Sequence, residues 1–207
     1  MNSLSIQKEK IENLASFNSQ FFAISENYKN GNYLKAEELA LISNNNFPNN
    51  EFILRILSDI YEKQNKKSQA INIYLQLIEV APDDLASYTN LGILYLQTDK
   101  LKKAEKIFRK ALEKNSYDFF LQYNLGITLV DLGEFEEAEL RLKTANNIDC
   151  NHAVVHNKLG YVTNKLGKIK ESETFYKKAL DLEPNNYLIL NSLAVVLKDL
   201  NKINEDE

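Results

Sequence analysis

The chain has 207 residues, a net charge of −4 and 44% hydrophobic residues, which suffices for a continuous core but provides no basic surface for nucleic acid. We therefore exclude nucleic acid as a partner. The single cysteine, Cys150, cannot form an intramolecular disulfide and fits a reducing compartment, so we expect a cytoplasmic protein.

The N-terminal segment, residues 1–16, is predicted to be a lead-in that precedes the folded part of the chain. It mixes charged residues such as Lys8 and Glu9 with isolated apolar ones, so it lacks the uninterrupted apolar core of a signal peptide. No run in the chain approaches the ~18–20 apolar residues that a membrane span needs, so no membrane partner is expected. Whether Met1 to Ser16 forms a separate helix or lengthens the first one is left open.

From Phe17 onward, one pattern of residue types recurs every 34 positions without an insertion. The clearest copy runs from Leu85 to Asp118. The recurring residues, copy by copy, are Leu57, Tyr61, Ala70, Tyr74 and Pro82; Tyr88, Leu91, Gly92, Tyr95, Ala104, Phe108 and Ala111; Leu125, Gly126, Ala138, Leu142 and Ala145; Leu159, Gly160, Ser172, Tyr176, Ala179 and Pro184. Apolar residues at this spacing form one stripe on each of two helices per copy.

Turn-forming residues stand at one position of every copy, between its two predicted helices. They are Gly31, Asn65, Asp99, Gly133, Gly167 and Asn201. These residue types accept a left-handed backbone at a helix C-terminus at little cost. Between copies, Pro48, Pro82 and Pro184 end a helix, and the Asn or Asp that follows is suited to cap the next one. The chain is therefore predicted to consist of helices and turns.

This period and these residue types resemble the tetratricopeptide repeat. The resemblance implies an all-α fold, a right-handed superhelical array of antiparallel helix pairs with five full repeats and a truncated sixth. The predicted repeats are residues 17–50, 51–84, 85–118, 119–152, 153–186 and, in part, 187–207. Glycines inside the predicted helices, such as Gly126 and Gly160, predict a close approach of the neighbouring helix, since each costs about 1 kcal/mol against alanine.

One cluster has a spacing that could bind a metal: Asp149, Cys150, His152 and His156. A tetrahedral zinc site would need the thiolate and both imidazoles to converge. Packing explains the cluster better, because Cys150 stands where other repeats have proline and His156 where the third repeat has Tyr88. We predict no metal and no cofactor.

Catalysis is not expected either. Both histidines of the chain lie in that cluster, so none is left elsewhere to activate a nucleophile. The glycines are isolated at helical spacing and form no phosphate-binding loop. The acidic run of Glu134, Glu136, Glu137 and Glu139 is interpreted as a solvated helix start that complements the helix dipole.

The resemblance also implies where a partner binds. In the family, five positions of each first helix line a concave groove that holds extended peptides or partner helices. The predicted peptide-binding residues are Phe52, Arg55, Ile56, Asn90, Ile93, Leu96, Phe120, Tyr123, Asn124, Ile127, Val130, Asn157, Lys158, Tyr161 and Asn191. Those in the middle of the groove are mostly apolar, and such a surface usually marks a binding site. The alternative is that tight superhelical curvature or the N-terminal segment covers these apolar residues, so that no partner binds there.

Two of these residues, Asn90 and Asn124, occupy the same position on successive helices. A side-chain amide offers a donor and an acceptor, the pair that grips a peptide backbone of any sequence. The arrangement is similar to the asparagine ladder in the repeat arms of protein O-glycosyltransferases. It is partial here, since Asn157 and Asn191 stand one place earlier. Some members of the family bind acidic C-termini with a clamp of basic residues and asparagines. This clamp is not expected here, because the chain keeps one basic residue of that pattern, Arg55, and one Asn.

These features predict a non-catalytic scaffold that binds a protein or peptide partner. One alternative is the N-terminal, substrate-presenting arm of a longer glycosyl-, sulfo- or methyltransferase. Another is self-assembly through the sixth helix, which is apolar nearly all round from Tyr187 to Leu200. We expect residues 1–207 either to form a homo-oligomer through this C-terminal edge or to be part of a longer array or enzyme.

Overall fold

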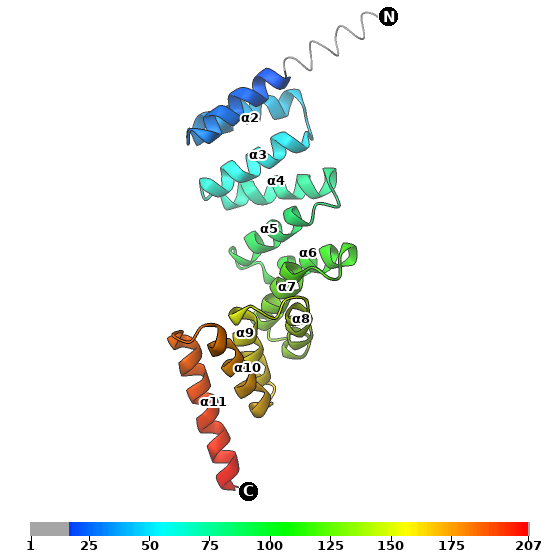
Figure 1. Ribbon diagram of the computed structural model, residues 1–207. Helices are drawn as coiled ribbons and strands as arrows, with labels where there is room; N and C mark the ends of the chain where they lie inside the picture. The colour runs from blue at the N-terminus through cyan, green and yellow to red at the C-terminus, as the bar shows by residue number, and fades with distance from the viewer. Residues whose placement is uncertain (1–16, 207) are drawn as a thin grey trace, which may run out of the picture. The chain divides into compact units, whose positions relative to one another are not determined.

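The computed structural model describes the backbone of residues 17–206 and the side chains of residues 17–201. Predictions for Met1 to Ser16 lie outside these residues. Helices make up the described part of the chain, and it contains no strand (Figure 1). Residues 17–29 form the first helix, and the others are α2 (Tyr33–Asn46), α3 (Glu51–Lys63), α4 (Lys67–Val80), α5 (Leu85–Leu96), α6 (Leu101–Lys114), α7 (Phe119–Leu132), α8 (Phe135–Ile148), α9 (Ala153–Lys165), α10 (Ile169–Leu182) and α11 (Tyr187–Asp206). None of the described helices is long and apolar enough to cross a membrane.

The chain divides into two compact units, with the boundary between Leu94 and Tyr95 inside α5. Unit 1 holds the first helix, α2, α3, α4 and most of α5, and unit 2 holds the helices from α6 to α11. Within each unit, consecutive helices pack against each other, as α3 does with α4 and α9 with α10. The all-helical pairing predicted from the repeated pattern is therefore confirmed, while the exact repeat ranges stay a prediction.

The predicted turn position between paired helices has a left-handed backbone in five of its six copies. The φ angles are 76° at Gly31, 56° at Asn65, 55° at Asp99, 78° at Gly133 and 73° at Gly167. At each of these residues one helix ends and the chain reverses into the next. This part of the sequence prediction is confirmed.

The sixth copy of that position, Asn201, was predicted wrongly, because α11 continues through it to Asp206. Asparagine tolerates a left-handed backbone but does not require one, and within a helix it costs only about 0.5 kcal/mol against alanine. The helices α10 and α9 pack on α11, but within residues 17–206 no helix follows α11 that would pack back on it after a reversal at Asn201. Each further residue of the helix instead adds a backbone hydrogen bond.

Side-chain caps fix several helix starts, as the residues after the prolines predicted. The Asn50 side chain accepts hydrogen bonds from the amides of Phe52 (3.1 Å) and Ile53 (3.3 Å). Asn186 caps α11 in the same way, through the amides of Leu188 and Ile189. Such a cap satisfies backbone donors that the first helical turn leaves unpaired.

The recurring apolar residues form the cores of both units. The first helices of the pairs contribute the fully buried Leu57, Tyr88, Leu91, Leu125 and Leu159, and the second helices contribute Ala70, Ala104, Ala138 and the buried Ser172. The helix glycines mark close contacts. A Cβ atom at Gly126 would lie 2.8 Å from Cγ of Leu142, and one at Gly160 would lie 2.9 Å from the Tyr176 ring. The predicted close approach of the second helix is confirmed at both.

Candidate functional site

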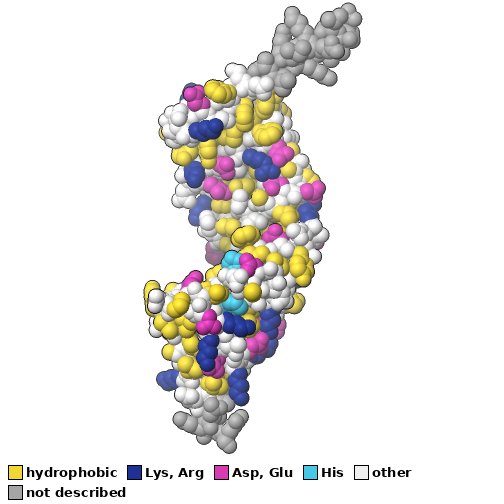
Figure 2. Space-filling model, in the orientation of Figure 1, with side chains coloured by type: hydrophobic (Ala, Val, Ile, Leu, Met, Phe, Trp, Pro, Cys, Tyr) yellow, Lys and Arg dark blue, Asp and Glu magenta, His cyan; other side chains and the backbone are white. Residues whose placement is uncertain are grey.

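The first helix of each pair leaves one side uncovered, and we call these sides the A-helix face of each unit. In unit 1 it is carried by the first helix, α3 and α5. The predicted residues Phe52, Arg55, Ile56, Asn90 and Ile93 lie in this unit, and none of them is buried. The space-filling view shows hydrophobic side chains at the surface among charged and neutral polar ones (Figure 2). The core positions of the same helices are fully buried, so the face and the core use different sides of each helix.

Aromatic rings gather at one end of the unit 1 face. The Phe21 and Phe52 ring centroids lie 6.1 Å apart, edge to face, and those of Phe17 and Phe47 lie 5.2 Å apart. Phe22 and Phe52 nevertheless keep 69% and 63% of their surface exposed. Edge-to-face contact is favourable, but it leaves much of this aromatic area in water, where a partner would gain by covering it.

Asn90 is held by a short chain of polar contacts. Its amide Nδ2 donates to the Tyr74 hydroxyl (3.0 Å), and that hydroxyl donates to Oε1 of Glu62 (2.6 Å). Burial raises the pKa of Tyr74, and its bond to Glu62 raises it further, so the phenol stays protonated. The chain orients the Asn90 amide and occupies one of its two donors.

Carboxylates lie at the other end of the unit 1 face. Asp59 and Glu62 on α3 are both exposed, and Asp59 makes no ion pair or hydrogen bond with residues 17–206. Arg55, one turn earlier on α3, is already bound by Glu51 (2.8 Å) and Asp84 (2.9 Å). The one arginine predicted to touch a ligand is therefore tied to protein carboxylates.

Unit 2 presents its A-helix face from α7, α9, α11 and the end of α5. The predicted residues of this unit are all half-buried or exposed: Leu96, Phe120, Tyr123, Asn124, Ile127, Val130, Asn157, Lys158, Tyr161 and Asn191. Phe119 lies at the centre of an aromatic cluster at one edge of this face. Its ring centroid lies 5.3 Å from that of Phe120, 6.2 Å from that of Tyr123 and 4.4 Å from that of His152. Phe120 itself remains 63% exposed.

One donor of the Asn124 side-chain amide is engaged within its own helix. Its Nδ2 donates to the backbone carbonyl of Phe120 (2.8 Å), one turn earlier on α7. Asn90 belongs to unit 1 and Asn124 to unit 2, so a continuous ladder through both stays a prediction. The structure shows that each amide has one donor engaged within its own unit.

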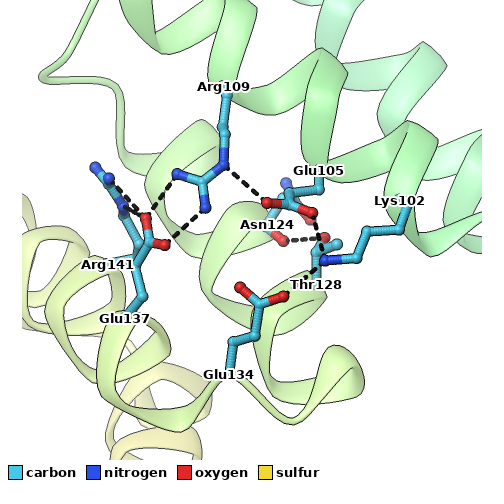
Figure 3. A network of polar contacts seen from close by, with 8 residues as sticks. All are labelled: Lys102, Glu105, Arg109, Asn124, Thr128, Glu134, Glu137 and Arg141. Atoms are coloured by element: carbon cyan, nitrogen blue, oxygen red, sulfur yellow. Dashed lines mark hydrogen bonds and ion pairs between the residues drawn. The ribbon is translucent and has the colours of Figure 1, made fainter.

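A network of charges on the second helices is the polar feature that the sequence interpretation missed. Arg109 on α6 forms two parallel bonds of 2.7 Å to the carboxylate of Glu137 on α8 and a third to Glu105 (Figure 3). Arg141 also binds Glu137 (2.9 Å). These bonds lower the pKa of Glu137 to about 2.

The acidic run of residues 134–139 does start a helix, with Glu136 and Glu137 in the first turn of α8, but its interpretation as simply solvated was wrong for Glu134, Glu137 and Glu139. Lys102 binds Glu134 (2.7 Å), and Glu139 is buried between Lys143 (2.8 Å) and Lys168 (2.6 Å). A signal for this network was present in the sequence, since Arg109 and Lys143 are 34 residues apart, as are Glu137 and Glu171. The cations on one second helix thus meet the carboxylates on the next.

Comparison with known proteins agrees with the helix pairs. Three family models described as tetratricopeptide repeat match residues 57–119, 153–186 and 175–207, which together cover more than half of the chain. The chain belongs to the tetratricopeptide repeat family. No curated protein sequence gives a significant match.

Solved tetratricopeptide repeat structures share the fold. YrrB, a TPR protein with an unusual peptide-binding site, superposes with a TM-score of 0.76 at 14% identity, over 92% of this chain and 97% of that one. MamA AMB-1 has a TM-score of 0.66 and 26% identity, over 78% and 95%. MamA from Desulfovibrio magneticus RS-1 has a TM-score of 0.72 and 14% identity, over 82% and 96%.

The cysteine and the two histidines of this tetratricopeptide repeat chain contact different partners. His152 Nε2 lies 2.8 Å from Oδ2 of Asp149, whereas His156 is buried with its Nε2 2.9 Å from the carbonyl oxygen of Cys150. The Cys150 side chain is exposed. No group of three potential ligands within the described residues is arranged to hold a metal ion.

Proposed function

We propose that this tetratricopeptide repeat protein is a non-catalytic cytoplasmic scaffold that binds a peptide segment or partner helix on its A-helix faces. The observation that carries the proposal is the contrast within single helices. In α7, Leu121 and Leu125 are fully buried, while Phe120 on the same helix remains 63% exposed. Aromatic and aliphatic area left in water at regular positions is typical of a binding surface.

The arrangement of the unit 2 face favours an extended peptide. Two apolar rows recur on α7, α9 and α11, one formed by Phe120, Val154 and Leu188 and the other by Ile127, Tyr161 and Val195. On each helix the rows are seven residues apart, about 10.5 Å, and Asn124, Asn157 and Asn191 lie between them, the last two one place earlier in the repeat than Asn124. Side chains of an extended peptide alternate between two sides, so they would reach both rows while the amides bond its backbone.

The peptide-binding site of YrrB supports this proposal by analogy of fold. The position of Asn90 and Asn124 supports it by chemistry, since each amide retains one donor and its carbonyl oxygen. We assign to the predicted peptide-binding residues the role of lining the site.

A double substitution tests the amides. Asn90→Ala with Asn124→Ala should weaken binding of peptides selected from a random displayed library by about 1–3 kcal/mol, roughly 5- to 150-fold in Kd, because each lost amide removes hydrogen bonds to a peptide bound on the face of its own unit. Fluorescence anisotropy measures the Kd. The matched control is Asn72→Ala with Asn147→Ala, exposed amides on second helices. Equal Kd values for both double variants would contradict the role of the amides.

A further inference from the structure

An uncompensated negative charge lies on the A-helix face of unit 1. Asp59 is exposed on α3, and Glu62 follows one turn later with one oxygen engaged by the Tyr74 hydroxyl. Tyr28 of the first helix lies close enough for both carboxylates to raise the pKa of its phenol, although burial is the larger cause. Two helices therefore border this acidic end of the face.

The neighbouring cations do not neutralise Asp59. Arg55 is committed to Glu51 and Asp84, and Lys63 lies one turn away without forming an ion pair with Asp59 within the described residues. Burial raises the pKa of Asp59, and the charge of Glu62 raises it further, against the smaller opposing effects of Lys63 and Arg55. Water reaches the carboxylate, yet the surrounding protein has replaced part of its hydration.

Paired carboxylates elsewhere in the chain behave in the opposite way. Glu105, Glu137 and Glu139 lie on second helices, each bound by two cationic side chains, and the pKa of each is lowered. Asp59 carries an equal charge on the face proposed to bind a partner, without such a cation. The charge that would complement it is positive, and it has to come from the ligand.

The aromatic end of the same face indicates which residue of the ligand accompanies its positive charge, and at what spacing. Phe52 and Asp59 are seven residues apart on α3, about 10.5 Å along the helix. The side chains of an extended peptide that runs between these two positions alternate between them. When one apolar side chain lies against Phe52 and Phe22, the side chain of the next residue therefore points to the carboxylates, where the Tyr28 ring offers a further surface to a cation.

We propose that the A-helix face of unit 1 binds an extended peptide in which a lysine or arginine stands next to a large apolar residue, with the cation between Asp59 and Glu62. This assignment rests on the proposed function, and it names the ligand's charge and spacing. It distinguishes unit 1 from unit 2, whose face presents Lys158 and, beside the Tyr161 ring, Lys165.

Selection from a random displayed peptide library tests the assignment on the full chain. Peptides selected by the unaltered protein should be enriched in Lys or Arg next to Leu, Ile, Phe or Tyr. Selection by Asp59→Asn should lose this enrichment, and a synthetic selected peptide should bind this variant about tenfold more weakly. Replacement of its cation by norleucine should weaken binding to the unaltered protein equally. Asp59→Asn is preferred to Glu62→Gln, because Glu62 also accepts from Tyr74.

The control variant is Glu79→Gln, an exposed carboxylate on α4, which should select the same peptides as the unaltered protein. Selected peptides without a preference for cations, or a preference that Asp59→Asn preserves, would overturn the assignment and leave peptide binding intact. Failure of the unaltered protein to select any peptide would instead overturn both this assignment and the proposed function.

Discussion

The two units have the same kind of core, but the residues on the outer side of their second helices differ. In unit 2, Arg109 and Lys143 bind carboxylates on the following second helix, so α6, α8 and α10 are linked by ion pairs. In unit 1, the same repeat position holds Leu41 and Leu75, both partly exposed, although Lys66 at the start of α4 binds Glu37 of α2 (2.6 Å) as Lys168 binds Glu139 in unit 2. A helix pair therefore needs the buried stripe, whereas its outer contacts are free to be charged or apolar.

The difference also shows what the charges contribute. Exposed ion pairs are typically worth about 0–1 kcal/mol, although a two-bond contact such as that of Arg109 with Glu137 is stronger. Burial of one leucine outweighs most of them. We expect the core to set the stability of both units and the ion pairs to set how stability changes with pH.

The largest effects should come from matched core positions. Leu91→Ala in unit 1 and Leu125→Ala in unit 2 each remove a fully buried side chain at the same repeat position. Each should lower the free energy of unfolding by about 2–5 kcal/mol, because a cavity remains. Urea denaturation followed by circular dichroism measures this. A cost below about 1 kcal/mol in one unit alone would show that its core is not equivalent.

Acid should affect unit 2 through Glu137. The folded pKa of this carboxyl is lowered from 4.5 to about 2, so its contribution is complete above pH 4.5 and is lost as the pH falls from there to about 2. Glu137→Gln should remove about 1–3 kcal/mol at pH 7 and flatten the acid limb of a stability curve. Glu136→Gln, an exposed neighbour, serves as the control and should change neither. An unchanged acid limb in Glu137→Gln would contradict the role of the network.

A smaller effect is expected from the uncovered side of α11. Leu54 and Tyr61 of α3 are 0% and 6% exposed, whereas Leu190 and Leu197, at the same positions of α11, are 46% and 37% exposed. Apolar side chains of this size in water favour self-association, so light scattering at micromolar concentration should detect oligomers. Leu190→Lys with Leu197→Glu should restore the monomer. A monomeric unaltered chain would contradict association through this helix.

The smallest effect is expected from a chelator. The side chains of Asp149, Cys150, His152 and His156 do not converge, so EDTA should leave the melting temperature unchanged. Differential scanning calorimetry with and without EDTA checks this. A drop of several degrees would reveal a metal that stabilises the protein.

Several functional contacts could not be predicted from the sequence, because they join residues that are far apart in the chain. The bond from Asn90 to Tyr74 crosses two helices, and it decides how much of the amide is left for a ligand. The isolation of Asp59 could not be predicted either, since Arg55 stands one turn away and only the structure shows that Glu51 and Asp84 occupy it. The pairing of Arg109 with Glu137 depends on the packing of α6 and α8 in the same way.

The sequence by itself determined the helices, their pairing and the buried stripe, because these depend on local residue types and a repeat that places like residues in like contacts. Gly133 and Asn65 show this, since each ends a helix with the left-handed backbone that its residue type favours. Tertiary structure alone decided Asn201, where α11 continues and, within the described residues, no following helix packs back on it. It also decided which charges are neutralised, because Coulomb energy depends on distances of a few ångströms and on desolvation, neither of which is encoded by residue spacing.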